Sequence, residues 1–105
     1  MTLKQKALAH YDRMIEWADK QPKRNRCSDV YMYDKILEYW GGECCPYCQK
    51  ISEQDLNCSY CRLHADNDDY KSCCNGTWDH MDRANTWGTW VKRARKVREY
   101  IEKNG

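Results

Sequence analysis

The sequence contains no phenylalanine, only two prolines, five glycines, and no long apolar run. No stretch approaches the roughly 18 apolar residues of a membrane-spanning helix, so we expect no membrane partner. The first residues lead directly into an amphipathic pattern, without the apolar core and cleavage site of a secretory signal. We therefore expect a cytoplasmic protein in a reducing compartment.

Apolar side chains are also scarce overall. The mean hydropathy is −1.08, and 32% of the 105 residues are charged. A chain of this length forms one domain, and ordering each residue costs about 1–2 kcal/mol of backbone entropy. An additional stabilising element is therefore expected. Eight cysteines could provide it, and in a reducing compartment clustered cysteines bind metal more often than they form disulfides, which remain the alternative.

Two amphipathic helices are predicted in the first part of the chain, because apolar residues recur there at spacings of three and four. The first spans residues 3–20 and ends before Pro22, with His10 and Trp17 lying away from the centre of its apolar stripe. The second spans residues 29–40, begins at an N-cap Ser28 and is closed by Gly41-Gly42. Its expected buried stripe is Val30, Tyr33, Ile36, Leu37 and Trp40.

A third long helix is predicted over residues 86–103, preceded by a short turn at residues 78–83. Residues 43–76 have no clean period but hold seven of the eight cysteines. The predicted fold is therefore a mainly α, single domain covering residues 1–105. An irregular, zinc-organised loop region, compatible with a short β-hairpin, lies between its flanking helices.

The cysteines of this loop region include two Cys-x-x-Cys units, Cys45–Cys48 and Cys58–Cys61, with nine residues between them. A two-residue gap lets one tight turn direct both sulfurs to the same ion, and two such turns complete a tetrahedral site. We therefore predict one structural Zn²⁺, bound by these four thiolates. Four thiolates leave no open coordination position, so the site is not expected to be catalytic.

The other sulfurs leave alternatives open. Cys44, Cys74 or His64 could replace or supplement one of the four ligands. A second site built from Cys27, Cys44, Cys73 and His80 is also conceivable.

Cys45-Pro46-Tyr47-Cys48 is, in addition, the active-site tetrapeptide seen in glutaredoxins, where the first cysteine is a nucleophile of low pKa. No β-branched strand precedes it here, and the other proline, Pro22, lies upstream. Dithiol redox chemistry is therefore the third-ranked hypothesis, after two non-enzymatic ones.

The middle of the chain resembles small cysteine-rich proteins of tailed bacteriophages and prophages, most of which have no assigned function. These carry Cys-x-x-Cys, a gap, Cys-x-x-Cys and then Cys-x-Gly-Thr, matched here by the two Cys-x-x-Cys units and by residues 74–77. Arg62 stands where that family often has proline, and Cys27, Cys44 and Cys73 are extra. The resemblance implies a zinc-binding accessory protein made in the bacterial host cytosol, and it implies no reaction.

Charge is segregated along the chain. Residues 1–26 carry a net +4, residues 27–82 a net −7 and residues 83–105 a net +5. The densest basic run contains Lys92, Arg93, Arg95 and Lys96. This run is either a solvated helix face or a surface for phosphates or an acidic protein, although a pI near 8.1 is low for a nucleic-acid-binding domain.

Five tryptophans and eight tyrosines provide side chains of the kind that dominate binding interfaces. Trp17, Tyr47 and Tyr60 are expected to be exposed and to contact a partner. The leading hypothesis is a non-enzymatic zinc-stabilised binding protein that docks on a host protein, and the phage resemblance implies that it inhibits a defence system or redirects a host enzyme. The alternative is a zinc protein that binds nucleic acid through the basic helix. A dimer is compatible with the sequence but is not required by it.

Overall fold

The computed structural model describes residues 1–41, 44–56, 63–66 and 71–105. Its elements in chain order are α1 (Leu3–Asp19), α2 (Asp29–Ile36), α3 (Pro46–Glu53), β1 (His64–Asp66), β2 (Lys71–Cys73), the 3₁₀ turn η2 (Cys74–Gly76), α4 (Thr77–Asp82) and α5 (Trp87–Asn104). The fold is mainly helical, as the sequence predicts. No helix within the described residues combines the length and the apolar character needed to cross a membrane.

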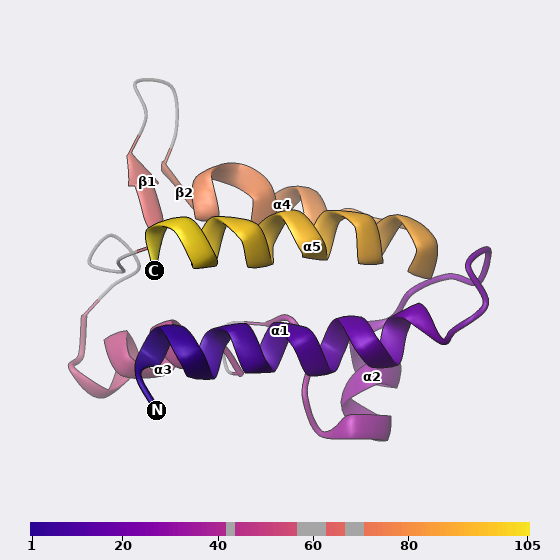
Figure 1. Cartoon of the computed structure of the whole chain (residues 1–105), viewed down its shortest axis with the longest axis horizontal. Helices are drawn as coiled ribbons and strands as arrows, with labels where there is room; N and C mark the ends of the chain where they lie inside the picture. Colours follow the sequence, from indigo (N-terminus) through magenta and orange to yellow (C-terminus); the bar gives the residue numbers. More distant parts are fainter. Residues whose placement is uncertain (42–43, 57–62, 67–70) are drawn as a thin grey trace.

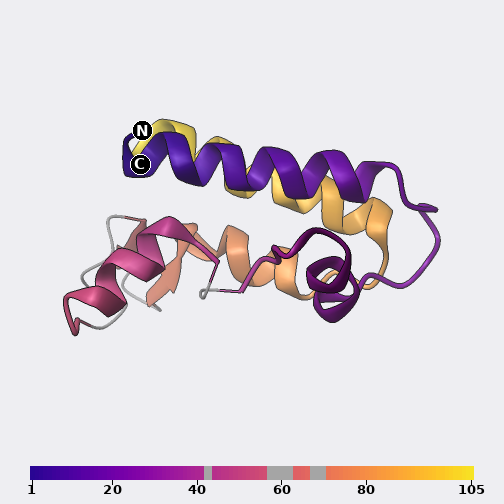
Figure 2. The same cartoon turned by 90° about the horizontal axis from the view of Figure 1, so that it is seen from below.

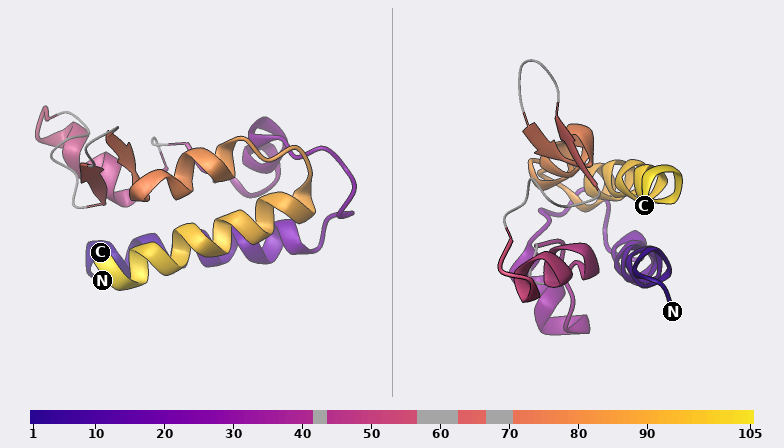
Figure 3. Two further views of the ribbon diagram at one scale, coloured as in Figure 1. Left: turned by 90° about the horizontal axis from the view of Figure 1, so that it is seen from above. Right: turned by 90° about the vertical axis from the view of Figure 1, so that its left-hand side faces the viewer.

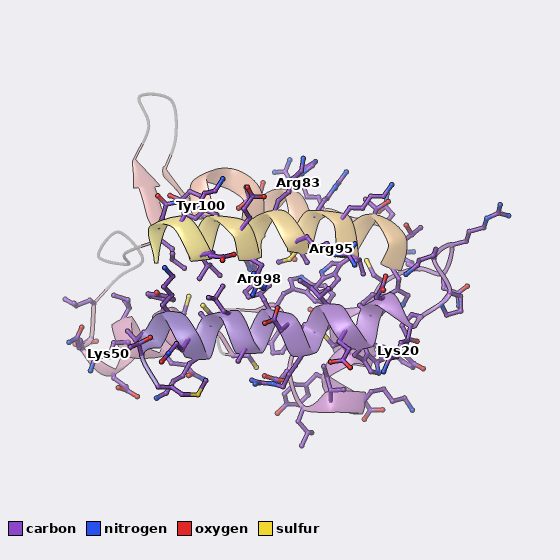
Figure 4. All side chains as sticks on the ribbon, in the orientation of Figure 1. Lys20, Lys50, Arg83, Arg95, Arg98 and Tyr100 are labelled. Carbon is purple, nitrogen blue, oxygen red and sulfur yellow. The ribbon has the colours of Figure 1, made fainter. Side chains whose placement is uncertain are left out.

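The two long helices, α1 and α5, run antiparallel and side by side, so the ends of the chain lie close together (Figure 1). The three-and-four spacing is confirmed in both facing stripes, except that His10, expected away from the centre of the α1 stripe, is buried in it. The buried residues are Ala7, His10, Tyr11, Met14, Ile15 and Ala18 from α1, and Trp87, Trp90, Val91, Ala94, Val97 and Ile101 from α5. Arg98 of α5 lies between the two helices (Figure 4), where its guanidinium is paired with Asp12 of α1.

Both long helices are closed at their N-termini by specific hydrogen bonds. Thr2 and Gln5 form a capping box at the start of α1. At the start of α5, the amides of Trp87 and Gly88 donate to the carbonyls of Asn25 and Lys23 at 3.0 and 3.1 Å. The loop after α1 is thereby fixed against the first turn of α5.

Helix α4 forms a second layer on the α5 side of the α1–α5 pair. Beside it lies a tryptophan cluster, Trp40, Trp87 and Trp90. Helix α4 runs along α5 (Figure 3), and Trp40 packs beside Trp90 and Trp87 with ring centroids 5.0 and 6.4 Å apart. The indole of Trp78 donates to the Trp40 carbonyl at 2.8 Å. The core is therefore aromatic as well as aliphatic, which compensates for the missing phenylalanines.

Helix α2 differs from its prediction in length and in orientation. It ends at Ile36 rather than at residue 40, and Leu37 adopts a left-handed conformation (φ 59°, ψ 25°) as its C-cap. Because the chain leaves the helix there, Trp40 can turn into the tryptophan cluster. The expected buried stripe is therefore wrong for Val30, Tyr33 and Leu37, which are exposed, while Met32 is the buried residue of α2.

The cysteine-rich region contains more regular structure than expected. Helix α3 begins at Pro46, a residue favoured at the first helical position. Strands β1 and β2 pair antiparallel, with His64 opposite Cys73, so the short hairpin is confirmed. The two strands and α2 lie at opposite sides of the molecule (Figures 1 and 2).

Candidate metal centre and docking surface

The first Cys-x-x-Cys unit lies at the N-terminus of α3, where Cys45 is the N-cap residue and Cys48 belongs to the first turn. A hydrogen bond from the Cys48 thiol lowers the pKa of Cys45 to about 6. Burial opposes this effect, and the backbone amides of Cys48 and Tyr47 reinforce it. The arrangement therefore favours a thiolate at Cys45 near neutral pH.

A thiolate of this kind is the form that binds zinc, and Cys45 with Cys48 could supply half of a tetrahedral site. Within residues 1–41, 44–56, 63–66 and 71–105, no three His, Cys, Asp or Glu side chains come together as a metal site. Cys44 and Cys74 thus do not complete a three-ligand group with Cys45 and Cys48. The other two predicted ligands, Cys58 and Cys61, lie outside the described residues, as does the side chain of His64.

Two of the remaining cysteines, Cys27 and Cys74, take part in the packing of the core. The Cys27 thiol donates to the Ala84 carbonyl at 3.1 Å, and burial raises its pKa. Cys74 is buried, and its amide donates to the Leu63 carbonyl at 2.9 Å. Both residues belong to the packing between the helices.

The three aromatic residues expected to be exposed differ in their surroundings. Trp17 is partly buried and packs edge-on against Trp87, 5.2 Å away, and at a tilt against Tyr31, 5.7 Å away. Tyr47 is only 5% exposed, so the expectation of an exposed contact residue is corrected, because Tyr47 packs into the core. Tyr60 lies outside the described residues.

The basic run of α5 is partly occupied by intramolecular contacts. Arg93 donates to the His80 carbonyl at 2.8 Å, and Arg95 lies 3.8 Å from Asp19. Figure 4 shows that Arg95 and Arg98 come from the part of α5 that lies along α1. Lys92 and Lys96 are exposed, and they are the cations of this run that remain most accessible to a partner.

An apolar stripe is exposed on α2. Val30, Tyr33 and Leu37 are 74%, 48% and 72% exposed. The spacing of Val30 and Tyr33 places them on one face of α2, and Leu37 is the C-cap residue of the same helix. We call these three residues the α2 stripe. Asp29 and Asp34, which are also exposed, are the acidic residues of the same helix. The sequence contained the apolar spacing, but it gave no indication that this face points away from the core.

A polar network lies beside one end of the stripe. Glu38 accepts hydrogen bonds from Arg13 Nε at 2.7 Å and lies 3.0 Å from His10 Nδ1. Together with Leu37, these residues line a surface cavity of about 390 Å³ between α1 and α3. His10 is 2% exposed, and burial lowers its pKa, despite the opposing hydrogen bond with Glu38.

Comparisons with protein-family models, with curated proteins and with solved structures found no match to this chain. The assignment of a function therefore depends on the geometry described above.

Proposed function

We propose that this chain is a non-enzymatic, zinc-stabilised protein-binding module that docks on its partner through the α2 stripe. The observation that carries the proposal is the exposure of Val30 and Tyr33 on one face of α2 and of Leu37 at its C-cap. In a chain with a mean hydropathy of −1.08, apolar side chains are few, and most of the large ones are used in the core. A contiguous apolar face left in water is a typical sign of an interaction site.

A protein partner is favoured over nucleic acid by the distribution of charge. Arg93 and Arg95 are engaged by His80 and Asp19, so they are less available to phosphates. The charged residues of α2 beside the stripe are carboxylates, which would repel a phosphate backbone. Binding of nucleic acid through Lys92 and Lys96 remains the alternative.

Zinc would have a structural role in this proposal. Cys45 and Cys48 would hold the ion together with Cys58 and Cys61, and the bound ion supplies folding free energy that a small apolar core lacks. The low pKa of Cys45, about 6, supports this assignment because the ligand must be deprotonated.

The setting of the proposal comes from the resemblance to phage accessory proteins. We propose that the partner is a bacterial host protein in the host cytosol, and that docking inhibits a defence system or redirects a host enzyme. The supporting features are the paired Cys-x-x-Cys units and the Cys-x-Gly-Thr run.

The docking surface is tested by selecting peptides from a random library on the zinc-loaded full chain. The selected peptides should lose binding to the Leu37→Asn and Val30→Ser variants. They should keep binding to Leu56→Asn, which alters an exposed leucine in the segment that follows α3. Peptides that distinguish none of these variants would argue against the α2 stripe as the docking surface.

The nucleic-acid alternative is tested with duplex DNA over a series of salt concentrations. Phosphate binding should weaken steeply as salt rises and should be lost in a Lys92→Ala, Lys96→Ala double variant. The proposed module should show no binding of this kind.

The metal is tested by native mass spectrometry of protein expressed in the cytosol, with and without a chelator. One bound zinc is expected, and Cys45→Ser should lose it while Cys27→Ser keeps it, because Cys27 bonds to Ala84 rather than to a metal. A metal-free chain that is as stable toward urea as the zinc-loaded chain would contradict the structural role of zinc.

A second candidate function, dithiol redox chemistry, is favoured by one observation. Cys45 at the N-terminus of a helix, with a pKa of about 6 and Cys48 beside it, has the arrangement of a nucleophilic thiol. In that case Cys45 would attack a substrate disulfide and Cys48 would release the reduced substrate by closing the Cys45–Cys48 disulfide. Redox activity that disappears in Cys45→Ser, with fold and metal content unchanged, would favour this candidate.

A further inference from the structure

We propose that the occupant of the α2 stripe is an amphipathic α-helix that carries lysine or arginine on both sides of its apolar face. This inference rests on the proposed function, and it adds the chemistry of the partner. Three observations carry it: the shape of the stripe, the charges beside it and the neighbouring charges that are already paired.

The shape of the stripe fits a helix. Val30 and Tyr33 lie three residues apart on one face of α2, and Leu37, the left-handed C-cap residue of this helix, adds a third exposed apolar side chain at its C-terminal end. We call this exposed apolar surface the ridge. Helix α2 has eight residues, so it is about 12 Å, or two turns, long, and Leu37 continues the exposed apolar surface just past its end. Tyr39 packs edge-on against Tyr33, with ring centroids 5.6 Å apart, and widens the ridge at its middle.

The charges beside the ridge are acidic. Asp34 follows Val30 by four residues and lies next to it on one side, while Asp29 lies on the other side of the ridge, toward Tyr33. Asp34 forms no ion pair with any of the described residues. Asp29 Oδ1 already accepts a hydrogen bond from the Val30 amide at 2.8 Å, whereas Asp34 has no such bond among the described residues. A partner with cations on both flanks would therefore face one bonded and one unpaired carboxylate at the borders of an apolar contact.

Two other charged side chains near the stripe, Lys35 and Glu38, already have intramolecular partners. The Lys35 ammonium lies 5.4 Å from the centroid of the Tyr31 ring, on a different side of α2. Glu38 is bound by Arg13 and His10. On α2 itself, the charge presented beside the stripe is therefore that of Asp29 and Asp34, while the exposed Lys6 of α1 lines the cavity next to Leu37.

Two other occupants fit this surface less well. A second copy of the chain, pairing stripe to stripe, would bring identical carboxylates together, which is unfavourable in an apolar interface. An anionic membrane surface would be repelled by the same carboxylates. A basic amphipathic helix satisfies both the apolar ridge and its acidic borders.

The experiment uses the zinc-loaded full chain and two synthetic helical peptides of 18 residues. Both peptides have the same leucine face, and one carries lysine while the other carries glutamate at every polar position. The chain has a net charge of +2, so overall charge does not favour the lysine peptide. We expect the lysine peptide to bind with a Kd on the order of 10 µM, because the stripe is smaller than a stable interface, and the glutamate peptide to bind at least about tenfold more weakly.

Matched variants distinguish binding at the α2 stripe from non-specific binding elsewhere on the chain. Leu37→Asn removes an apolar side chain at a left-handed position that asparagine tolerates, so it should weaken binding of the lysine peptide about tenfold or more without loss of folding. Leu56→Asn should leave binding unchanged. Asp34→Asn should weaken binding about two- to fivefold, whereas Asp55→Asn, the same change at an exposed position beyond the end of α3, should not.

The outcomes distinguish this inference from the function on which it rests. If the glutamate peptide binds as well as the lysine peptide, and Leu37→Asn abolishes both, the stripe is a docking surface but the cationic partner is wrong. If Leu37→Asn changes neither peptide's binding, both the inference and the docking surface are wrong. If neither peptide binds, the helical partner is wrong, and the proposed function is judged by the peptide selection alone.

Discussion

The indole Nε1 of Trp40 donates to Oδ1 of Asp82 at 3.0 Å, across 42 positions of sequence. Trp40 follows α2, and Asp82 is the last residue of α4. This hydrogen bond therefore connects the segment that positions α2 to the layer that packs on α5. It also gives the buried indole, 6% exposed, the acceptor that it needs.

Removal of this acceptor should destabilise the fold. We expect Asp82→Ala to lower the free energy of unfolding by about 1–2 kcal/mol, because the buried N–H loses its partner. Asp82→Asn keeps an acceptor oxygen and should lose less. Urea unfolding followed by tryptophan fluorescence measures both. Asp79→Ala is the matched control, because it removes an exposed ion pair with Arg83. It should change the free energy of unfolding by less than about 0.5 kcal/mol. An equal loss of stability in all three variants would contradict this role of Asp82.

Leu37 holds a left-handed conformation that is unfavourable for a residue with a Cβ. Leu37→Gly should therefore be more stable than Leu37→Ala by about 0.5–1 kcal/mol, after allowance for the greater freedom of glycine in the unfolded chain. The loss of the leucine side chain itself should matter little, since it is 72% exposed. Thermal unfolding by circular dichroism compares the two variants, and equal midpoints would show that the backbone of Leu37 is not left-handed in solution.

The long helices could be predicted from sequence because each has one clear apolar stripe; α5 buries its expected residues, and α1 departs from its prediction at His10, which is buried. The second helix was less predictable because Val30, Tyr31, Met32 and Tyr33 surround it with apolar and aromatic side chains. Several faces could then be buried, and the choice of Met32 depends on tertiary packing around Trp40. No local pattern contains that information.

The candidate site was predictable only in part, for a similar reason. The spacing of Cys45 and Cys48 correctly predicted two neighbouring sulfurs, since two intervening residues form one turn. Helix α3 was missed because eight residues are too few for a clear period; Pro46 at its first position was the available signal. His10 was placed outside the apolar stripe, yet it is buried, because Glu38 provides a polar partner that lies 28 positions away in sequence.

The thiol of Cys45 should titrate well below an ordinary cysteine in the reduced, metal-free chain. Its pKa of about 6 predicts that most of it is thiolate at pH 7, and that iodoacetamide modifies it before Cys27, whose pKa is raised by burial. Mass spectrometry of peptides after timed alkylation gives the pH profile of each thiol. Cys48→Ala should raise the pKa of Cys45, because the hydrogen bond from Cys48 is the main cause of its shift. A Cys45 profile unchanged in Cys48→Ala would contradict this geometry.

The stability of the metal-free chain should fall as the pH is lowered, through two groups that act in different windows. Cys45 has a folded pKa of about 6 against an ordinary value of 9.0, so its contribution is present above pH 9 and is lost as the pH falls toward 6. Burial lowers the pKa of His10 from 6.5, so below pH 6.5 the unfolded chain takes up a proton that the folded chain resists. The free energy of unfolding measured in urea should therefore decline continuously from pH 9 to pH 5.

Two variants separate the two groups. Cys45→Ser should remove the pH dependence of the unfolding free energy above pH 6.5. His10→Gln should reduce the pH dependence below pH 6.5, because glutamine can still bond to Glu38 but does not titrate. A His10→Gln variant that keeps the full acidic decline would show that His10 is protonated equally easily in the folded and unfolded chain, and that its burial against Glu38 is not maintained in solution.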